Sequence, residues 1–352
     1  MAEHRDELNI GRFLEAQAGG IYEQALAELR AGCKQGHWIW FVFPQVRGLG
    51  FSWAADYYGI GSWEEAEAYL ADEVLRSRLR EAARALLDLP GEDPEAVLGP
   101  IDALKVRSSC TLFELVSDAP EFPAVLNRHY AGERDPLTLE IVKGFPTHNV
   151  LFLDFDGVMQ PDYDKSHEMP LDEFCALRTW AAENYENEGF LHVGNDDIAA
   201  ALRDWTNEAV EGVRRIAEEG DARIVISSSW RFYDEDDNLR CLLKLRGLDG
   251  HFAGALSRSH SLEREDAIRL YLAQHPCSVR NYVAVDDAKL IGLDGHFVRI
   301  RKGSIREEDA EKALLVLNGE GYCEYEGDDE GDEEEGFWEL DPVVASSIEW
   351  RM

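Results

Sequence analysis

The sequence lacks any long hydrophobic run, and its cysteines are few and scattered. No run approaches the roughly 18 consecutive apolar residues that a membrane-spanning helix needs. The opening residues, MAEHRDELNI, do not follow the basic-then-apolar pattern of a signal peptide. The six cysteines form no CxxC pair, which argues against a zinc knuckle or a disulfide framework and favours reduced thiols. We therefore expect a cytoplasmic protein that makes no contact with a membrane.

Positive charge is also in short supply. The chain has 35 Lys and Arg residues against 70 Asp and Glu residues, which gives a net charge of −35. A surface with that charge repels polyanions, so we expect no extended nucleic-acid groove and only local contact with a phosphate group. The rest of the composition is ordinary for a globular protein, with 45% hydrophobic residues over 352 positions. This length is enough for roughly two to three domains.

Three regions differ in sequence pattern, and the first two predict folded domains. Residues 11–143 predict a mainly helical domain, with apolar side chains at helical spacing over 21–31 and one long helical pattern over 63–88. Residues 149–318 alternate short apolar strands with amphipathic helices. This alternation predicts an α/β domain, a three-layer Rossmann-like fold whose parallel sheet is covered on both faces. The strands are expected at 149–153, 223–226, 282–285 and 296–300.

The third region, residues 319–352, predicts an acidic and disordered tail. Nine of the twelve residues over 324–335 are acidic, so we expect this run to stay solvated. We favour a solubilising linker. The alternative is a tail that lies over the phosphate site, docked on the basic residues Arg299, Arg301, Lys302 and Arg306.

The residues Asp154-Phe155-Asp156-Gly157 directly follow the apolar strand 149–153. The carboxyl ends of parallel strands meet at the ligand crevice, so both carboxylates are expected in one polar site. Gly157 supplies the backbone freedom that the turn needs. Two neighbouring carboxylates repel each other, and a hard cation such as Mg²⁺ is their natural partner. One carboxylate could then attack phosphorus while the other handles the leaving-group proton.

Three further groups follow in order along the chain. The run Ser227-Ser228-Ser229 ends a second strand and offers hydroxyls to a phosphate oxygen. Arg264 opens a helix and offers a positive charge. The pair Asp286-Asp287 ends a third strand and offers further metal ligands.

These segments resemble a known family. LFLDFDGV, VISSSWR and YVAVDD, with a basic residue before a helix between the last two, resemble the haloacid dehalogenase (HAD) superfamily of phosphohydrolases. The SSSWR form, with Trp205 opening the preceding helix, is similar to the branch named after Swiss Army Knife RNA repair proteins. The resemblance covers about residues 149–318. It implies a Mg²⁺-dependent phosphatase that acts on a phosphorylated small molecule or a nucleic-acid end.

The resemblance also implies roles for individual residues. Asp154 would be the nucleophile, and Asp156 would be the general acid and base. Ser227 would bind the phosphoryl group, or Ser228 would do so if the strand is one residue longer.

The third motif of the superfamily is usually a lysine. Here Arg264 stands in the matching place, with Arg258 as a competitor. The Mg²⁺ ligands would be carboxylates of the first and fourth motifs, namely Asp154, Asp156, Asp286 and Asp287. Gly157 is a candidate substrate-binding residue.

Residues 160–205 form an insertion between the first acidic motif and the next helix. Its place predicts a small cap that would decide leaving-group specificity, and a plain surface excursion is the alternative. Trp230 is expected to pack under the loop rather than to act as a substrate platform. Arg231, a further substrate-binding candidate, would meet either a phosphate or a structural acid.

The N-terminal region resembles domain-of-unknown-function family 1810 over about residues 11–143. The match runs through HWIWFVFPQ, residues 37–45, and GLGFS, residues 48–52, and the family name carries no activity. Four polar and aromatic residues here could form a pocket for a flat ligand such as a nucleobase: Lys34, His37, Trp38 and Gln45. The alternative, which we favour, is that the tryptophans are core and the polar groups bridge helices.

We therefore predict a Mg²⁺-dependent phosphomonoester hydrolase that acts through an aspartyl-phosphate. Its expected substrate is a nucleotide or a nucleic-acid terminal phosphate. The alternative is a protein that senses a nucleotide-like ligand through its N-terminal domain, with a slow or incidental phosphatase. Phosphate release from nucleotides and phosphorylated oligomers would separate the two.

Overall fold

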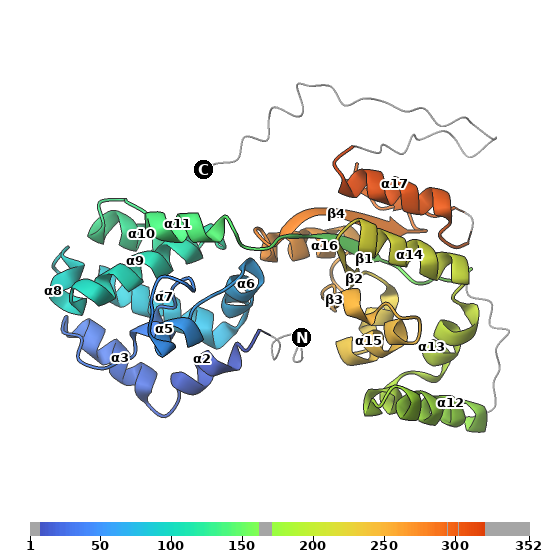
Figure 1. Cartoon of the computed structure of the whole chain (residues 1–352), viewed down its shortest axis with the longest axis horizontal. Helices are drawn as coiled ribbons and strands as arrows, with labels where there is room; N and C mark the ends of the chain where they lie inside the picture. The colour runs from blue at the N-terminus through green and yellow to red at the C-terminus, as the bar shows by residue number, and fades with distance from the viewer. Residues whose placement is uncertain (1–7, 162–170, 294, 302, 321–352) are drawn as a thin grey trace. The chain divides into compact units, whose positions relative to one another are not determined.

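The computed structural model describes residues 8–161, 171–293, 295–301 and 303–320 (Figure 1). The chain divides into two compact units, residues 1–147 with 272–278 and residues 148–271 with 279–352. The acidic run predicted over 324–335 lies outside the described residues, as does Lys302 of its predicted docking site. Within the described ranges, no helix is both long enough and apolar enough to span a membrane.

The N-terminal unit is mainly helical, as predicted. Its core is built around aromatic side chains, where Tyr69 packs on Phe13 and on Phe113 with ring centroids 5.0 and 5.2 Å apart. Both phenylalanines are fully buried. The helices are α2 (Gly11–Ala16), α3 (Ile21–Arg30), α4 (Ile39–Val42), α5 (Trp53–Tyr57), α6 (Trp63–Ala71), α7 (Glu73–Leu87), α8 (Pro94–Leu98), α9 (Pro100–Leu115), α10 (Glu121–His129) and α11 (Pro136–Val142).

The helical pattern over 63–88 corresponds to two helices rather than the one that we expected. The chain leaves the helical conformation at Asp72, with φ −70° and ψ 119°, between α6 and α7. The Asp72 carboxylate accepts hydrogen bonds from the backbone N–H groups of Val74 and Leu75, at 3.0 and 3.1 Å. It therefore caps α7. Apolar spacing continues across the break, so periodicity alone does not reveal it.

The second unit contains a five-stranded sheet with the order β3-β2-β1-β4-β5, in which every neighbouring pair is parallel. This confirms the α/β prediction. The strands are β1 (His148–Leu153), β2 (Ala222–Ile226), β3 (Phe252–Ala255), β4 (Val279–Asp286) and β5 (Phe297–Arg299). The helices are α12 (Leu171–Asn184), α13 (Asn195–Ala199), α14 (Asn207–Glu219), α15 (Asp236–Lys244), α16 (Arg264–Gln274) and α17 (Glu307–Leu317), with short turns η1 (Glu188–His192), η2 (Ala200–Asp204), η3 (Ser229–Phe232) and η4 (Asp249–His251).

Helices cover both faces of the sheet. Leu151 and Leu153 of β1 belong to one apolar cluster with side chains of α14 and α17. Phe152 points to the other face, where its ring packs edge-on against Tyr271 of α16 at 5.4 Å. Alternate residues of the central strand are thus buried on opposite sides, which is why the strand has no polar face.

The edge strand β3 was not predicted. It has only four residues, Phe-Ala-Gly-Ala, and Gly254 has a φ of 135°. A strand of small residues carries little apolar signal in the sequence. Its pairing with β2 supplies the backbone hydrogen bonds that hold it in place.

The register of the three central strands determines where the polar residues lie. Leu153 at the end of β1 pairs with Ile226 of β2 and with Val285 of β4. The residues that follow these three along the chain are Asp154, Ser227 and Asp286. Because the strands are parallel, these three positions meet at one edge of the sheet.

The cap at Asp72 gives a prediction for stability. Asp72→Ala should lower the free energy of unfolding by about 1 kcal/mol, because two N–H groups at the start of α7 lose their acceptor. Asp72→Ser keeps an acceptor and should stay close to the wild type. Urea unfolding of the intact chain, followed by circular dichroism, measures both. Equal midpoints for the Ala and Ser variants would contradict a stabilising cap.

Candidate active site

Three carboxylates converge at the carboxyl edge of the sheet. Asp154, Asp286 and Asp287 each offer an oxygen that lies within 4.8 Å of the others. Asp154 is 3% exposed and Asp286 is fully buried. Burial raises the pKa of Asp286, and the charge of Asp154 raises it further, while Arg264 opposes the rise. Carboxylates that lie this close together and are buried need positive charge beside them.

Arg264, the first residue of α16, provides that charge. Its Nη1 donates to Asp154 Oδ2 at 2.5 Å and also to Asp286 Oδ2. Burial alone would lower the pKa of Arg264, but the two carboxylates raise it above its ordinary value. The other candidate, Arg258, instead forms an ion pair with Asp236 at 2.5 Å. Of the two arginines considered for the third motif, Arg264 is the one that contacts the acidic cluster.

The acidic cluster has the donor chemistry of a magnesium site. Carboxylate oxygens are the hard ligands that Mg²⁺ takes in proteins, so Asp154, Asp286 and Asp287 fit the ion. Asp156 was also predicted as a ligand, but it is not a member of this cluster in the described part of the chain. Its metal-binding role stays a prediction.

Asp156 lies beside the cluster and is held by two side chains. Trp230 Nε1–H donates to Asp156 Oδ2 at 2.9 Å, and Gln160 Nε2–H donates to Oδ1 at the same distance. Burial raises the pKa of Asp156, and these hydrogen bonds oppose the rise. The carboxyl group is thus fixed in position one residue beyond the buried Phe155.

Trp230 has a role that the sequence did not indicate. Its ring packs edge-on against Phe155 at 5.1 Å, so it does pack under the loop as expected. Its indole N–H, however, is used to orient Asp156. The only signal in the sequence was the position of Trp230 directly after the serine run, which does not specify a hydrogen-bond partner.

Gly157 has a conformation and a position that only glycine fits. Its φ is 71°, and a Cβ at this residue would lie 2.5 Å from the Cγ of Asp287. The absent side chain therefore lets Asp287 approach the turn after β1. Its predicted contact with substrate stays a prediction.

The serine run separates into two roles. Strand β2 ends at Ile226, so Ser227 is the first residue beyond it, and its N–H donates to Leu153 O at 2.9 Å. Ser228 Oγ accepts from the N–H of Trp230 at 3.4 Å and caps the turn η3. Ser227 therefore occupies the position that the resemblance gives to the phosphoryl-binding hydroxyl.

The described hydrogen bonds of Arg231 go to main-chain oxygens and not to a structural acid. Its guanidinium donates to the main-chain carbonyl oxygens of Ser227, Ser228 and Ser257. Arg231 is only 2% exposed, and burial lowers its pKa to about 10. These contacts brace the loop after β2, and the substrate-binding role stays a prediction.

In the N-terminal unit, Lys34 and Trp38 make structural contacts. Lys34 Nζ lies 2.7 Å from Asp102, and the buried Trp38 donates its indole N–H to Glu28 at 2.7 Å. His37 is exposed, whereas Gln45 is buried. These positions agree with the interpretation in which the tryptophans are core. A ligand site at these residues stays a prediction.

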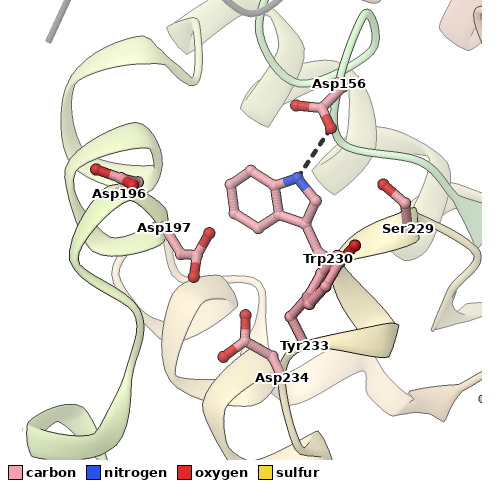
Figure 2. Close-up of a pocket in the computed structure, with 7 residues that line it drawn as sticks. All are labelled: Asp156, Asp196, Asp197, Ser229, Trp230, Tyr233 and Asp234. Atoms are coloured by element: carbon pink, nitrogen blue, oxygen red, sulfur yellow. Dashed lines mark hydrogen bonds between the residues drawn. The ribbon is translucent and has the colours of Figure 1, made fainter. Parts of the chain in front are cut away.

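The insertion contributes side chains next to Asp156. Asp196 and Asp197 of α13 line a pocket of about 260 Å³ together with Asp156 and residues of the η3 turn (Figure 2). The α13 part of the insertion is therefore adjacent to Asp156, the candidate general acid. Residues 162–170 of the insertion lie outside the described ranges.

The comparisons agree with this division of the chain. A family model described as the HAD domain in Swiss Army Knife RNA repair proteins matches residues 150–309, and one described as a protein of unknown function (DUF1810) matches residues 7–142. A crystal structure of a conserved hypothetical protein from Mycobacterium tuberculosis is 45% identical, with a TM-score of 0.38. It covers 39% of this chain and 98% of its own. No curated protein matches. Both resemblances seen in the sequence are thus confirmed as family matches, to the HAD domain in Swiss Army Knife RNA repair proteins over residues 150–309 and to DUF1810 over residues 7–142.

Proposed function

We propose that the chain is a Mg²⁺-dependent phosphomonoester hydrolase that acts through an aspartyl-phosphate on Asp154. The match to the HAD domain family supports phosphohydrolase chemistry in general. The observation that carries the finer proposal is the constellation around Asp154: a buried carboxylate contacted by Arg264, with two further acids within 4.8 Å. Asp156, two residues along the chain, is held by its own hydrogen bonds.

In the first step, an Asp154 oxygen attacks the phosphorus of the monoester. The bond between phosphorus and the alcohol oxygen breaks, and that oxygen takes the proton of Asp156. Asp154 then carries the phosphoryl group, Asp156 is ionised, and the alcohol leaves. Ser227 and Arg264 hold the phosphoryl oxygens during the transfer.

In the second step, Asp156 takes a proton from a water molecule whose oxygen attacks the phosphorus. The bond between phosphorus and Asp154 breaks, which releases inorganic phosphate and restores both side chains. When bound at Asp154, Asp286 and Asp287, Mg²⁺ supplies positive charge that offsets the phosphoryl oxygens and the clustered carboxylates.

The proposed substrate is a nucleotide or a nucleic-acid terminal phosphate. The family description names RNA repair proteins, which supports a nucleic-acid end. The net charge of −35 disfavours long contact with a polyanion. A mononucleotide, or the terminal phosphate of a short oligonucleotide, satisfies both considerations.

The nucleophile assignment predicts that Asp154→Asn lowers kcat by roughly a thousandfold or more, because an amide cannot form the aspartyl-phosphate. Phosphate release from p-nitrophenyl phosphate and from nucleotides measures the loss. Asp237→Asn, an exposed acid in the first turn of α15, is the matched control and should keep full activity. Near wild-type turnover by a folded Asp154→Asn chain would refute the assignment.

The metal assignment predicts that EDTA stops phosphate release and that added Mg²⁺ restores it. Asp287→Asn should raise the Mg²⁺ concentration needed for half-maximal activity, because the cluster loses one carboxylate. Titration of Mg²⁺ into the EDTA-treated wild type and variant measures this shift. Full activity in excess chelator would exclude the metal role.

The hydrogen bond from Trp230 predicts a dependence on the leaving group. Trp230→Phe removes the N–H that orients Asp156, so kcat for an alkyl phosphate should fall by about tenfold. The fall should be smaller for p-nitrophenyl phosphate, whose leaving oxygen needs little protonation. Trp205→Phe is the matched control, because Trp205 also packs on Phe155 while its indole N–H has no hydrogen-bond partner among the described residues. Equal losses on both substrates would show that Trp230 does not act through Asp156.

A further inference from the structure

A short segment at the end of β5 concentrates positive charge in an otherwise acidic chain. Residues 299–306, Arg-Ile-Arg-Lys-Gly-Ser-Ile-Arg, contain four basic residues and no acid, whereas the whole chain has a net charge of −35. We call these eight residues the basic segment. The structure describes all of them except Lys302. The mechanism proposed above assigns no role to their side chains.

The first end of the basic segment is fixed beside the acidic cluster. Arg299 pairs with Asp286 across β4 and β5, and its Nε–H donates to the main-chain oxygen of Asp287 at 3.0 Å. The next residue, Ile300, donates its N–H to Asp286 O at 2.9 Å. The basic segment therefore starts at the same edge of the sheet as the carboxylates that fit Mg²⁺.

The other end of the basic segment is fixed beside the turn that carries Asp156. Ile305 is fully buried, and its N–H donates to the main-chain oxygen of Val158 at 2.9 Å. Between the two ends, a Cβ on Gly303 would lie 3.6 Å from the Cα of Pro161. The basic segment therefore runs along the residues that follow Asp156, which keeps its side chains close to the proposed site.

The arginines of the basic segment carry their charge at the surface, since Arg301 and Arg306 are exposed. Acids follow in the first turn of α17, but two of them have partners of their own. Glu307 lies 3.9 Å from Arg215. Asp309 accepts a hydrogen bond from the main-chain N–H of Arg306 at 3.0 Å. An anion can therefore reach positive charge at this segment.

The pocket beside Asp156, in contrast, does not suit a second phosphate group. Its lining residues include Asp196, Asp197 and Asp234, and none of them is basic. A nucleic-acid end has a phosphodiester next to its terminal nucleotide, and acids repel that group. The basic segment offers it the positive charge that the pocket lacks.

We propose that the basic segment binds the phosphodiester next to the terminal phosphate of a nucleic-acid substrate. The inference rests on the proposed function, because it takes Asp154 as the site of the terminal phosphate. Of the two substrates given there, it selects a nucleic-acid end over a mononucleotide, which has no phosphodiester. Guanidinium groups bind phosphate oxygens through charge-assisted hydrogen bonds. Contact with one or two backbone phosphates is local, so it is compatible with the net charge of −35.

Electrostatics predicts opposite results with and without this contact. A strongly acidic chain repels an oligonucleotide more than a mononucleotide, and salt screens that repulsion. Without a phosphodiester site, the ratio of kcat/KM for the oligonucleotide to kcat/KM for the mononucleotide should be one or less and should rise with salt. With the site, the ratio should exceed one and fall with salt, because binding releases counterions from the phosphates.

The test compares uridine 3′-phosphate and uridine 5′-phosphate, each with the tetrauridylate that carries its terminal phosphate at the same end. For the end that is hydrolysed, the wild-type ratio should be about tenfold at low salt. It should fall with a log–log slope of about −0.7 for each backbone phosphate bound. In Arg301→Gln/Arg306→Gln, the ratio should fall to about one. Because the ratio is taken within each variant, a general loss of activity does not change it.

Arg223→Gln is the matched control. Arg223 is an exposed residue near the start of β2, at the edge of the sheet opposite to Ser227, and its replacement removes one positive charge. This variant should keep the wild-type ratio and its salt dependence. An oligonucleotide advantage that Arg301→Gln/Arg306→Gln retains in full would overturn the proposal.

A binding measurement separates this inference from the proposed function. The affinities of the same mononucleotides and tetrauridylates for the intact Asp154→Asn chain are measured by calorimetry at low and at high salt, which needs no turnover. Tighter binding of the tetrauridylate, lost at high salt and in Asp154→Asn/Arg301→Gln/Arg306→Gln, would support the basic segment even if no ester were hydrolysed. Hydrolysis with a ratio of one or less that rises with salt would overturn this inference and leave the phosphatase proposal standing.

Discussion

The second unit depends on how it tolerates several buried carboxylates at one edge of a sheet. Asp154 and Asp286 extend adjacent parallel strands, so the register of the sheet forces them together. Each would be costly to bury as an isolated charge. Arg264 reaches both from the first residue of α16. The burial of these carboxylates at the edge of the sheet therefore depends on the arginine at the start of α16.

Much of this arrangement was predictable, because it follows from rules that act locally or along a strand. Apolar runs of four or five residues predicted the strands, and the rule that parallel strands end at one edge predicted that Asp154, Ser227 and Asp286 would be neighbours. Strands β1, β2, β4 and β5 lie where they were expected, apart from their end residues. The sequence left Arg258 and Arg264 as alternatives, since both lie at or shortly before the start of α16. Only the fold shows which of them reaches the acids.

The features that were missed depend on contacts that no local pattern encodes. Strand β3 exists because β2 offers it hydrogen bonds, not because its small residues favour a strand. The break at Asp72 depends on a single side-chain cap inside an unbroken apolar period. The hydrogen bond between Trp230 and Asp156 joins residues that are 74 positions apart. The pairing of Asp197 with Asp234 likewise requires α13 and the loop before α15 to meet.

Two groups of buried acids lie near Asp156, and they are tolerated in different ways. Asp154 and Asp286 have Arg264 beside them, so positive charge offsets theirs. Asp197 and Asp234 hydrogen-bond to each other, and burial together with the charge of Asp234 raises the pKa of Asp197, so this pair can keep a proton instead. Positive charge is therefore placed where the proposed phosphoryl group would lie, and an acidic chain can attract a phosphate locally even though most of its surface repels one.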